Sequence, residues 1–367
     1  MNKWPTVELS EVCELKYGKS LPASKRVDGE FAVFGSNGVV GSHTDSITDG
    51  PTIIVGRKGS FGEVNWSNHA CWPIDTTYYI DGSATDADLR WLFHRLGSLG
   101  LTQLNRAAAV PGLNREDAYR KAITLPPIEE QRRIAAILDH ADALRAKRRE
   151  ALARLEELTQ SIFIDMFGDP VVNPFEYPIR ALGDIAEFYA GGTLPEGEGF
   201  AGQPDGFALL KVSDLNLLGN ERVLHTSQGW SARPGARSAT CPAGSVIIPK
   251  RGGAIGTNKK RLTSRPSVLD PNLMAITPHQ GQLCLEFLYA WFERLDLNSL
   301  VSGSSVPQLN KKDLAPLAIP IPPYELQLVF AARVNNIELI RSRHRANVAE
   351  LDTLFASLQS RAFRGEL

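Results

Sequence analysis

The sequence predicts a mixed α/β fold in which two similar globular domains are joined by two long helices that form an antiparallel coiled coil. Three observations predict this tandem, pseudo-two-fold fold: an internal repeat, a heptad-spaced apolar stretch in each half, and a proline pair before each stretch. The chain has 367 residues, 43% of them hydrophobic, so it is long enough for more than one core.

Short motifs that return at a constant distance are the evidence for duplication. Val110-Pro111-Gly112-Leu113-Asn114 returns 196 positions later as Val306-Pro307-Gln308-Leu309-Asn310, and a Pro-Pro-x-Glu-x-Gln motif returns at the same offset. The segments Leu9 to Pro22 and Leu182 to Pro195 match at the smaller offset of 173, so the second half contains 23 additional residues. Between these anchors the halves diverge, which indicates one framework with two different contents. A duplicated scaffold without a recognition role is the alternative interpretation.

Each half ends in an apolar pattern that is typical of a coiled-coil helix of roughly 36 residues, about 54 Å long. Two such stripes in one chain most simply bury each other. We expect Arg148, His344 and Asn347 to be polar seam positions that set the register. The residues predicted to form the apolar seam are Ile134, Ile137, Leu144, Leu155 and Leu158 in the first helix, and Ile337, Ile340, Leu351, Leu354 and Leu358 in the second.

The proline pairs divide the chain, because proline is tolerated at a helix start and disfavours helix in the residue before it. The predicted segments are a globular domain over residues 1-125, a long helix over 126-167, a second globular domain with its leading linker over 168-320, and a second long helix with a C-terminal tail over 321-367.

Two glycine-containing loops with neighbouring cations are the candidates for contact with a polyanion. Glycine lets the backbone approach a phosphate closely, and arginine can bind phosphate or guanine with two hydrogen bonds. An ordinary hairpin with solvated charges is the alternative for either loop alone. The candidate residues are Arg57 and Lys58 in the first half, Lys250, Arg251, Lys259, Lys260 and Arg261 in the second, and the polar residues Asn105, Arg106 and Ser304 before the repeated pentapeptides.

Overall composition indicates little about partners. The formal net charge is -1, so any contact with nucleic acid must come from local cation clusters. The four cysteines occur singly, without zinc-site spacing, and no apolar run of about 18 residues suggests a membrane helix. We therefore expect a soluble, cytoplasmic protein without a metal.

Catalytic motifs are missing from the sequence. Ile321-Pro322-Pro323-Tyr324 is similar to the Asp/Asn-Pro-Pro-Tyr motif of amino-group methyltransferases, but isoleucine cannot accept a hydrogen bond from the amino group that is methylated. The first-half copy lacks the polar and the aromatic member. The sequence has no phosphate-binding loop of the G-x-x-x-x-G-K-[ST] type, no nucleophile elbow and no H-E-x-x-H helix. We interpret both proline pairs as helix starts and expect no catalytic residue.

The ensemble of motifs resembles the specificity subunit of Type I restriction-modification enzymes. The resemblance rests on the two Val-Pro-x-Leu-Asn pentapeptides, the Pro126 to Gln131 and Pro322 to Gln327 helix entries, and Met166-Phe167-Gly168-Asp169-Pro170 followed by Leu182-Gly183-Asp184-Ile185. It extends over essentially the whole chain. Each globular domain then corresponds to a target recognition domain.

The resemblance implies that each target recognition domain reads one half of a bipartite double-stranded DNA target. It implies that the helices set the half-site spacing and dock two copies of an adenine methyltransferase subunit, which holds the S-adenosylmethionine. An ATP-dependent restriction subunit is a further possible partner, and no cofactor belongs to this chain. The alternatives are a coiled-coil scaffold that binds only proteins and a methyltransferase that acts alone.

Overall fold

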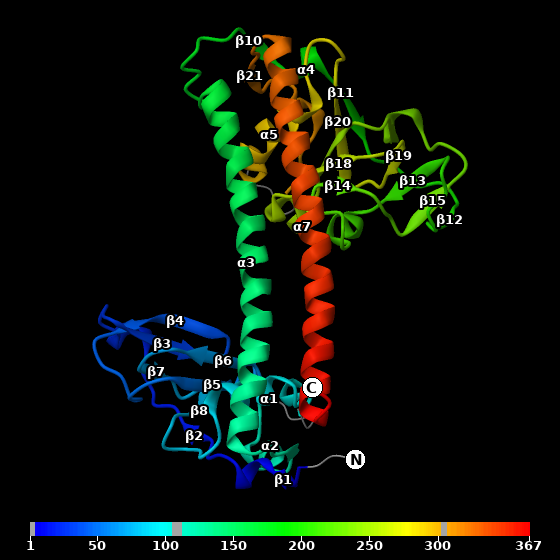
Figure 1. Cartoon of the computed structure of the whole chain (residues 1–367). Helices are drawn as coiled ribbons and strands as arrows, with labels where there is room; N and C mark the ends of the chain where they lie inside the picture. Colours follow the sequence, from blue (N-terminus) through cyan, green and yellow to red (C-terminus); the bar gives the residue numbers. More distant parts are fainter. Residues whose placement is uncertain (1–3, 105–111, 302–306) are drawn as a thin grey trace. The chain divides into compact units, whose positions relative to one another are not determined.

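The computed structural model describes residues 4–104, 112–301 and 307–367. Within these, the chain divides into two compact units: unit 1 contains residues 1–150 and 344–367, and unit 2 contains residues 151–343. The two longest helices, α3 (Ile128–Phe167) and α7 (Tyr324–Arg364), each contribute one part to either unit (Figure 1). The sequence-based division of the chain into two globular segments and two helix segments stays a prediction. It treats each long helix as a separate segment, whereas the two compact units each contain part of both helices.

Unit 1 contains three small sheets, one of which is two-stranded and pairs β1 with β9. The four-stranded antiparallel sheet has the order β2-β8-β5-β6, and the three-stranded sheet has the order β4-β3-β7, in which β3 and β7 are parallel. The strands are β1 (Thr6–Glu8), β2 (Lys16–Tyr17), β3 (Phe31–Gly35), β4 (Gly38–His43), β5 (Thr52–Gly56), β6 (Val64–Ser67), β7 (Cys71–Pro73), β8 (Thr77–Ile80) and β9 (Ala122–Thr124), and the short helices are α1 (Leu89–Gly97) and α2 (Arg115–Tyr119).

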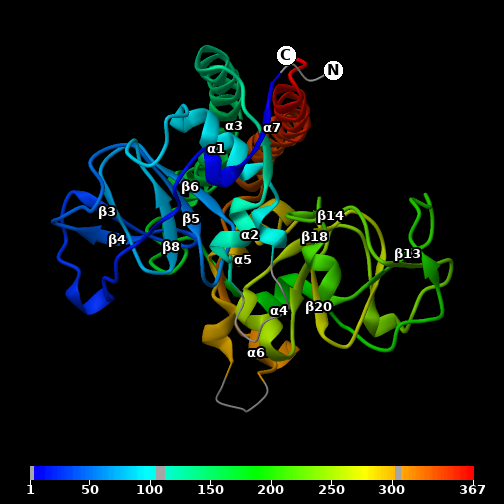
Figure 2. The same cartoon turned by 90° about the horizontal axis from the view of Figure 1, so that it is seen from below.

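The core of unit 1 joins these strands to the long helices. β5 is a fully buried run of β-branched residues, which is typical of a central strand. Helix α1 begins at the cap residue Asp88, whose side chain accepts a hydrogen bond from the Trp91 amide. The buried side of α1 packs against β5 and β6 and, through Trp91 and Leu92, joins the same core cluster as Ile134 of α3 (Figure 2).

Unit 2 repeats this plan with larger sheets, which accommodate the additional residues of the second half. Its sheets have the orders β11-β20-β17-β18-β14 and β12-β15-β13-β19-β16. The strands are β10 (Ile179–Ala181), β11 (Ala186–Ala190), β12 (Glu198–Gly199), β13 (Phe207–Leu210), β14 (Val223–Leu224), β15 (Gly229–Ser231), β16 (Thr240–Cys241), β17 (Val246–Pro249), β18 (Arg261–Thr263), β19 (Ser267–Leu269), β20 (Leu273–Pro278) and β21 (Ala318–Pro320), with helices α4 (Leu182–Ile185), α5 (Leu285–Arg294) and α6 (Lys311–Leu314).

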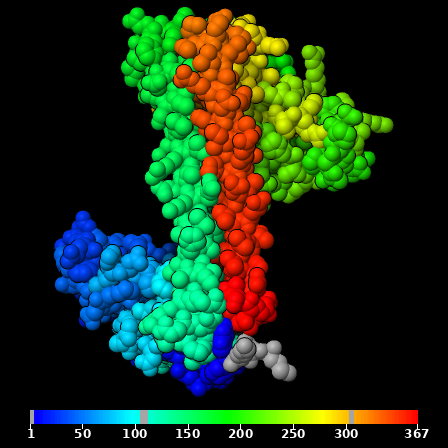
Figure 3. All heavy atoms as spheres, viewed as in Figure 1, coloured from blue at the N-terminus to red at the C-terminus, as the bar shows by residue number. Residues whose placement is uncertain are grey.

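Within each unit the parts of α3 and α7 pack together in antiparallel directions (Figure 3). In unit 1, Arg145 contacts Asp352 while Arg133, earlier in α3, contacts the C-terminal Leu367. In unit 2, Phe163 and Phe167 of α3 contact Phe330 of α7. The predicted mixed α/β fold with two β-rich domains and two packed long helices is confirmed.

The residues of the predicted seam differ in how deeply they are buried. Ile134 and Ile337 are buried and Ile137, Leu155, Leu351 and Leu358 are half-buried, but Leu144, Leu158, Ile340 and Leu354 are 41% to 51% exposed. Apolar side chains near the start of α3, such as Ile134 and Leu138, also pack into the globular core of unit 1. The predicted seam stays a prediction, and these four residues are its least buried members.

Candidate nucleic-acid interface

The first predicted basic loop follows β5 in unit 1. The Arg57 and Lys58 amides donate to the Thr76 carbonyl at 2.9 and 3.1 Å, and Gly59 has a positive φ of 74°, which glycine adopts without strain. The Leu113 amide donates to the Arg57 carbonyl at 2.9 Å, and Lys58 forms a β-bridge with Gly112. The loop is thus attached to the first repeated pentapeptide, and it leaves Lys58 exposed.

Unit 2 builds the same arrangement after β17. The Lys250 amide donates to the Asn272 carbonyl at 2.7 Å, and the Leu309 amide donates to the Lys250 carbonyl at 2.9 Å. Arg251 forms a β-bridge with Gln308 and is exposed, and Gly252 has a φ of 65°. Arg57 therefore corresponds to Lys250 and Lys58 to Arg251. Each half attaches a cation-bearing loop to its own Val-Pro-x-Leu-Asn segment.

The remaining cations of the second loop do not form one continuous exposed patch. Lys260 is 4% exposed, and its Nζ donates to the Leu295 carbonyl at 2.7 Å and to Asn258 Oδ1 at 2.8 Å. Burial lowers the pKa of Lys260 to about 8. Arg261 donates to the Lys260 and Leu215 carbonyls. These two side chains donate hydrogen bonds to oxygens of the protein itself.

The other candidates divide between partly exposed and undescribed positions. Lys259 is partly exposed and donates to Asn216 Oδ1. Lys250 is 7% exposed, and burial, followed by the charge of Arg251, lowers its pKa. Asn105, Arg106 and Ser304 lie outside the described residues. Contact of all these residues with DNA stays a prediction.

Beside the first loop lies a group of residues that the sequence analysis missed. Tyr17 of β2 is exposed, and the guanidinium carbons of Arg57 and Arg115 lie 5.1 and 5.2 Å from its ring centroid. Tyr78 of β8 lies 5.9 Å from the Arg57 guanidinium and 5.2 Å, centroid to centroid, from Tyr17. A sequence signal for Arg115 existed, because both repeated pentapeptides are followed at once by a cation, Arg115 or Lys311.

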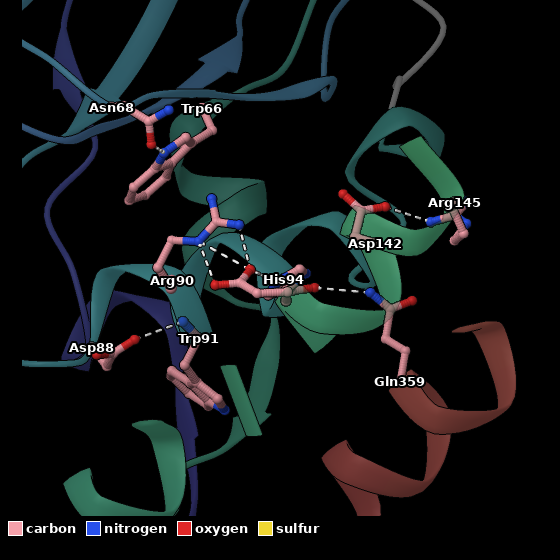
Figure 4. Close-up of polar contacts among 10 residues, drawn as sticks. Trp66, Asn68, Asp88, Arg90, Trp91, His94, Asp142, Arg145 and Gln359 are labelled. Carbon is pink, nitrogen blue, oxygen red and sulfur yellow. Dashed lines mark hydrogen bonds and ion pairs between the residues drawn. The ribbon is translucent and has the colours of Figure 1, made fainter. Parts of the chain in front are cut away.

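A polar network attaches helix α1 to both long helices within unit 1 (Figure 4). Arg90 and His94 both contact Asp139 of α3, the latter with a distance of 2.7 Å from Nε2 to Oδ1. Gln359 of α7 donates to the His94 carbonyl at 3.2 Å, and Arg90 also lies over the Trp66 ring at 4.5 Å. This network fixes the globular part of unit 1 to its helices.

Ionisation in this network is governed first by burial. Burial lowers the pKa of His94, and the hydrogen bond and the charge of Asp139 act in the opposite direction without reversing it. Burial acts to raise the pKa of Asp139, but hydrogen bonds from Arg90 and His94 outweigh it, so the pKa of Asp139 is lowered. The pair therefore combines a neutral imidazole with a carboxylate near neutral pH.

The described residues contain no group of three or more His, Cys, Asp or Glu side chains that could hold a metal ion. No described helix is both long enough and apolar enough to cross a membrane.

The two proline pairs lie directly before α3 and α7. Tyr324, which resembles a methyltransferase tyrosine in sequence, is the first residue of α7. Its position agrees with the interpretation of the proline pairs as helix starts.

Fold and site together define a duplicated protein in which each β-rich unit carries its own cation-bearing loop and shares two long helices with the other. The sequence matches the family model described as Type I restriction modification DNA specificity domain over residues 1–157 and 174–346. The chain belongs to this family. It is the non-catalytic DNA specificity subunit of a Type I restriction-modification system, with two target recognition domains, and it carries no cofactor itself.

Individual relatives agree with this family. The chain is similar to the Type I restriction enzyme EcoDI specificity subunit of Escherichia coli, with 21% identity over 99% of this chain and 88% of the relative. The similarity to the EcoprrI specificity subunit of Escherichia coli is 27% over 37% of this chain and 35% of that relative.

Solved structures show the same fold. The S subunit of a Type I restriction-modification system from M. genitalium matches with a TM-score of 0.67, at 16% identity, over 99% of this chain and 96% of that chain. A chain from a structural study of type I R-M complex assembly and conformational transition matches with a TM-score of 0.55 at 20% identity, over 99% and 98% of the two chains. Family membership also implies assembly with methyltransferase subunits.

Proposed function

We propose that each unit reads one half of a bipartite double-stranded DNA target, and that α3 and α7 set the spacing between the halves. The observation that carries this proposal is the attachment of a cation-bearing loop to the repeated pentapeptide in both units. Two different half-sites require two domains that share a framework but differ in the residues that contact the bases. In this proposal residues 1-125 and 168-320 are the target recognition domains, and 126-167 and 321-367 are the spacer helices.

Lys58 and Arg251 are the loop cations best placed for DNA, because both are exposed and occupy corresponding positions. Arg57, Lys250 and Lys259 lie beside them, while the internal hydrogen bonds of Lys260 and Arg261 suit these two for holding the loop. Asn105, Arg106 and Ser304 remain proposed contacts on sequence grounds alone.

The test is DNA binding by the assembled methyltransferase complex. We expect the Lys58→Gln/Arg251→Gln variant to weaken binding of the target several-fold and to reduce the salt dependence of binding, because two phosphate contacts are lost. Arg132→Gln is the matched control, since Arg132 is an exposed helix cation paired with Glu129. If the wild-type complex protected no specific sequence in footprinting, the protein-binding scaffold would be favoured instead.

We also propose that the complex contains two methyltransferase copies, which bind S-adenosylmethionine, and that an ATP-dependent restriction subunit can join it. The exposed apolar side chains of the long helices support two equivalent docking sites. Leu144 and Leu158 correspond, at the repeat offset of 196, to Ile340 and Leu354, and all four are at least 41% exposed. Each unit contains one of these four residues from α3 and one from α7. Two copies of the same partner could therefore bind equivalent surfaces, one on each unit.

A further inference from the structure

Two arginines in unit 1 lie against aromatic rings. The guanidinium carbon of Arg57 lies over Tyr17 and Tyr78, and that of Arg115 lies over Tyr17 and Tyr119, at 5.2 and 5.7 Å. Cation–π contacts of this kind orient a guanidinium but leave its positive charge uncompensated. Two like charges therefore share the ring of Tyr17.

The hydrogen-bond donors of this pair are incompletely used. The Nε atoms of Arg57 and Arg115 are buried and have no hydrogen-bond partner among the residues that the structure describes. Among the described residues, Arg115 Nε lies 3.9 Å from a carboxylate oxygen of the exposed Glu116, and Arg57 has no ion pair. The positive charges of Arg57 and Arg115 can therefore pair with an acceptor from outside the chain.

The same two positions carry cations in unit 2. Lys250 corresponds to Arg57, because its carbonyl accepts from the Leu309 amide as the Arg57 carbonyl accepts from the Leu113 amide. Lys311 follows the second pentapeptide as Arg115 follows the first, and its Nζ lies 5.5 Å from the centroid of the Phe188 ring. The tyrosines do not recur: Ala315 stands where unit 1 has Tyr119. The charges, and not their aromatic supports, are common to both units.

We propose that Arg57 and Arg115, supported by Tyr17, form a binding site for a DNA backbone phosphate, and that Lys250 and Lys311 form its counterpart in unit 2. This inference rests on the proposed function. Two domains that read different sequences must differ in their base contacts but can share contacts to phosphates, which carry no sequence information. The function of this site is to position each unit on the duplex, through Arg115 and Tyr17 in unit 1 and through Lys311 in unit 2.

The experiment compares the methyltransferase complexes of the wild type and of Arg57→Gln/Arg115→Gln, on a target duplex and a scrambled duplex, between 50 and 200 mM salt. We expect the slope of log K against log salt to become shallower by about 1, since each phosphate contact contributes about 0.9. Affinity falls by the same factor on both duplexes, and the methylated motif is unchanged. Arg120→Gln is the matched control, because Arg120 lies directly after the same short helix and pairs with Asp117.

Three further variants complete the test. Arg57→Lys/Arg115→Lys copies unit 2 and should retain the salt slope, and Tyr17→Phe should bind as the wild type does whereas Tyr17→Ala should not. An unchanged slope in the glutamine variant would overturn the proposal, and so would an altered motif, which indicates base reading. Failure of the wild type to distinguish the two duplexes would instead overturn the proposed function.

Discussion

At the residue scale, one glutamine in each half explains why the motif Pro-Pro-x-Glu-x-Gln is repeated. Gln131 Oε1 accepts from the Asp88 amide at 2.8 Å, and its Nε2 donates to the Pro126 carbonyl at 2.8 Å. Gln327 makes the same two bonds, to the Cys284 amide at 2.8 Å and the Pro322 carbonyl at 2.9 Å. Both glutamines are buried. Each side chain joins the start of a long helix to the start of the helix that packs on it.

We expect Gln131→Leu to lower the free energy of unfolding by about 2–4 kcal/mol, because a leucine leaves one backbone donor and one acceptor without partners. Urea unfolding of the full chain measures this loss. Gln327→Leu should have a similar effect in unit 2. Glu129→Leu, two residues earlier at an exposed position, is the control and should change the stability by less than about 0.5 kcal/mol. Equal effects of Gln131→Leu and Glu129→Leu would contradict the assignment.

His94 makes the stability of unit 1 depend on pH. Burial holds the pKa of His94 below its ordinary value, and the charged groups that face it are Arg90 of α1 and Asp139 and Asp142 of α3. The unfolded chain therefore binds a proton more readily than the folded one. The contribution of His94 is fully present above about pH 6.5, the ordinary pKa of histidine, and is lost as the pH falls towards the lowered value.

The corresponding measurement is the urea-unfolding midpoint between pH 7.5 and 5.5. His94→Gln keeps a side-chain donor for Asp139 but does not titrate, so the decrease in stability towards pH 5.5 should become smaller. His69→Gln, at an exposed position, is the control and should retain the wild-type pH dependence. A pH profile of His94→Gln that coincides with that of the wild type would exclude His94 as the titrating group.

At the element scale, the two long helices are held in register by ion pairs that the repeat duplicates. Arg145 of α3 contacts Asp352 of α7, with a distance of 2.6 Å from Nε to Oδ1. Arg341 of α7 contacts Glu156 of α3, with a distance of 3.6 Å from Nη2 to Oε2. Arg145 and Arg341 are 196 positions apart, and so are Glu156 and Asp352. These two pairs join the helices by charge, and the role of Arg148, His344 and Asn347 in setting the register stays a prediction.

A double-mutant cycle tests this pairing. We expect Arg145→Gln and Asp352→Asn to show a coupling free energy on the order of 0.5 kcal/mol, because both side chains are partly exposed and solvent weakens the attraction. The coupling should decrease at high salt. Thermal unfolding of the two single variants and the double variant measures it. A coupling of zero at low salt would mean that apolar contacts alone set the register.

The exposed apolar residues of the helices lead to a prediction about assembly. Leu144→Glu/Leu354→Glu changes unit 1 alone and Leu158→Glu/Ile340→Glu changes unit 2 alone. If each unit docks one methyltransferase copy, either variant should assemble with one copy instead of two, because a buried glutamate cannot replace leucine in an apolar contact.

Native mass spectrometry of the assembled complex counts the copies. Leu218→Glu is the control, since Leu218 is 94% exposed and lies outside the helices. Retention of two copies by both helix variants would place the docking surface elsewhere.

At the scale of the whole molecule, the proposed function makes the length of the long helices part of the recognition. Inserting seven helix-forming residues after Glu150 in α3 and after Ala346 in α7 lengthens each helix by roughly 10 Å. This corresponds to about three base pairs. We expect the spacing between the two half-sites to grow by about that number while the half-sites stay the same.

Sequencing of methylated DNA in a host that expresses the variant reads out the motif and its spacing. Insertion into α3 alone should abolish DNA methylation by the complex. The two helices then differ in length, and the ion pairs between α3 and α7 lose their register. An unchanged spacing in the double insertion would mean that α3 and α7 do not set it.

The sequence by itself determined the duplication, the two long helices, the positions of the basic loops and the absence of catalytic motifs, because repeats and heptad patterns are local and can be read along the chain. Only the tertiary structure decided which helix residues face the partner helix, that Lys260 bonds to internal oxygens, and that Arg115 and Tyr17 lie beside Arg57. The physical reason is that these facts depend on side chains brought together from positions that lie 35 to 207 residues apart in the chain. The sequence around each of these side chains is compatible with several different packing arrangements.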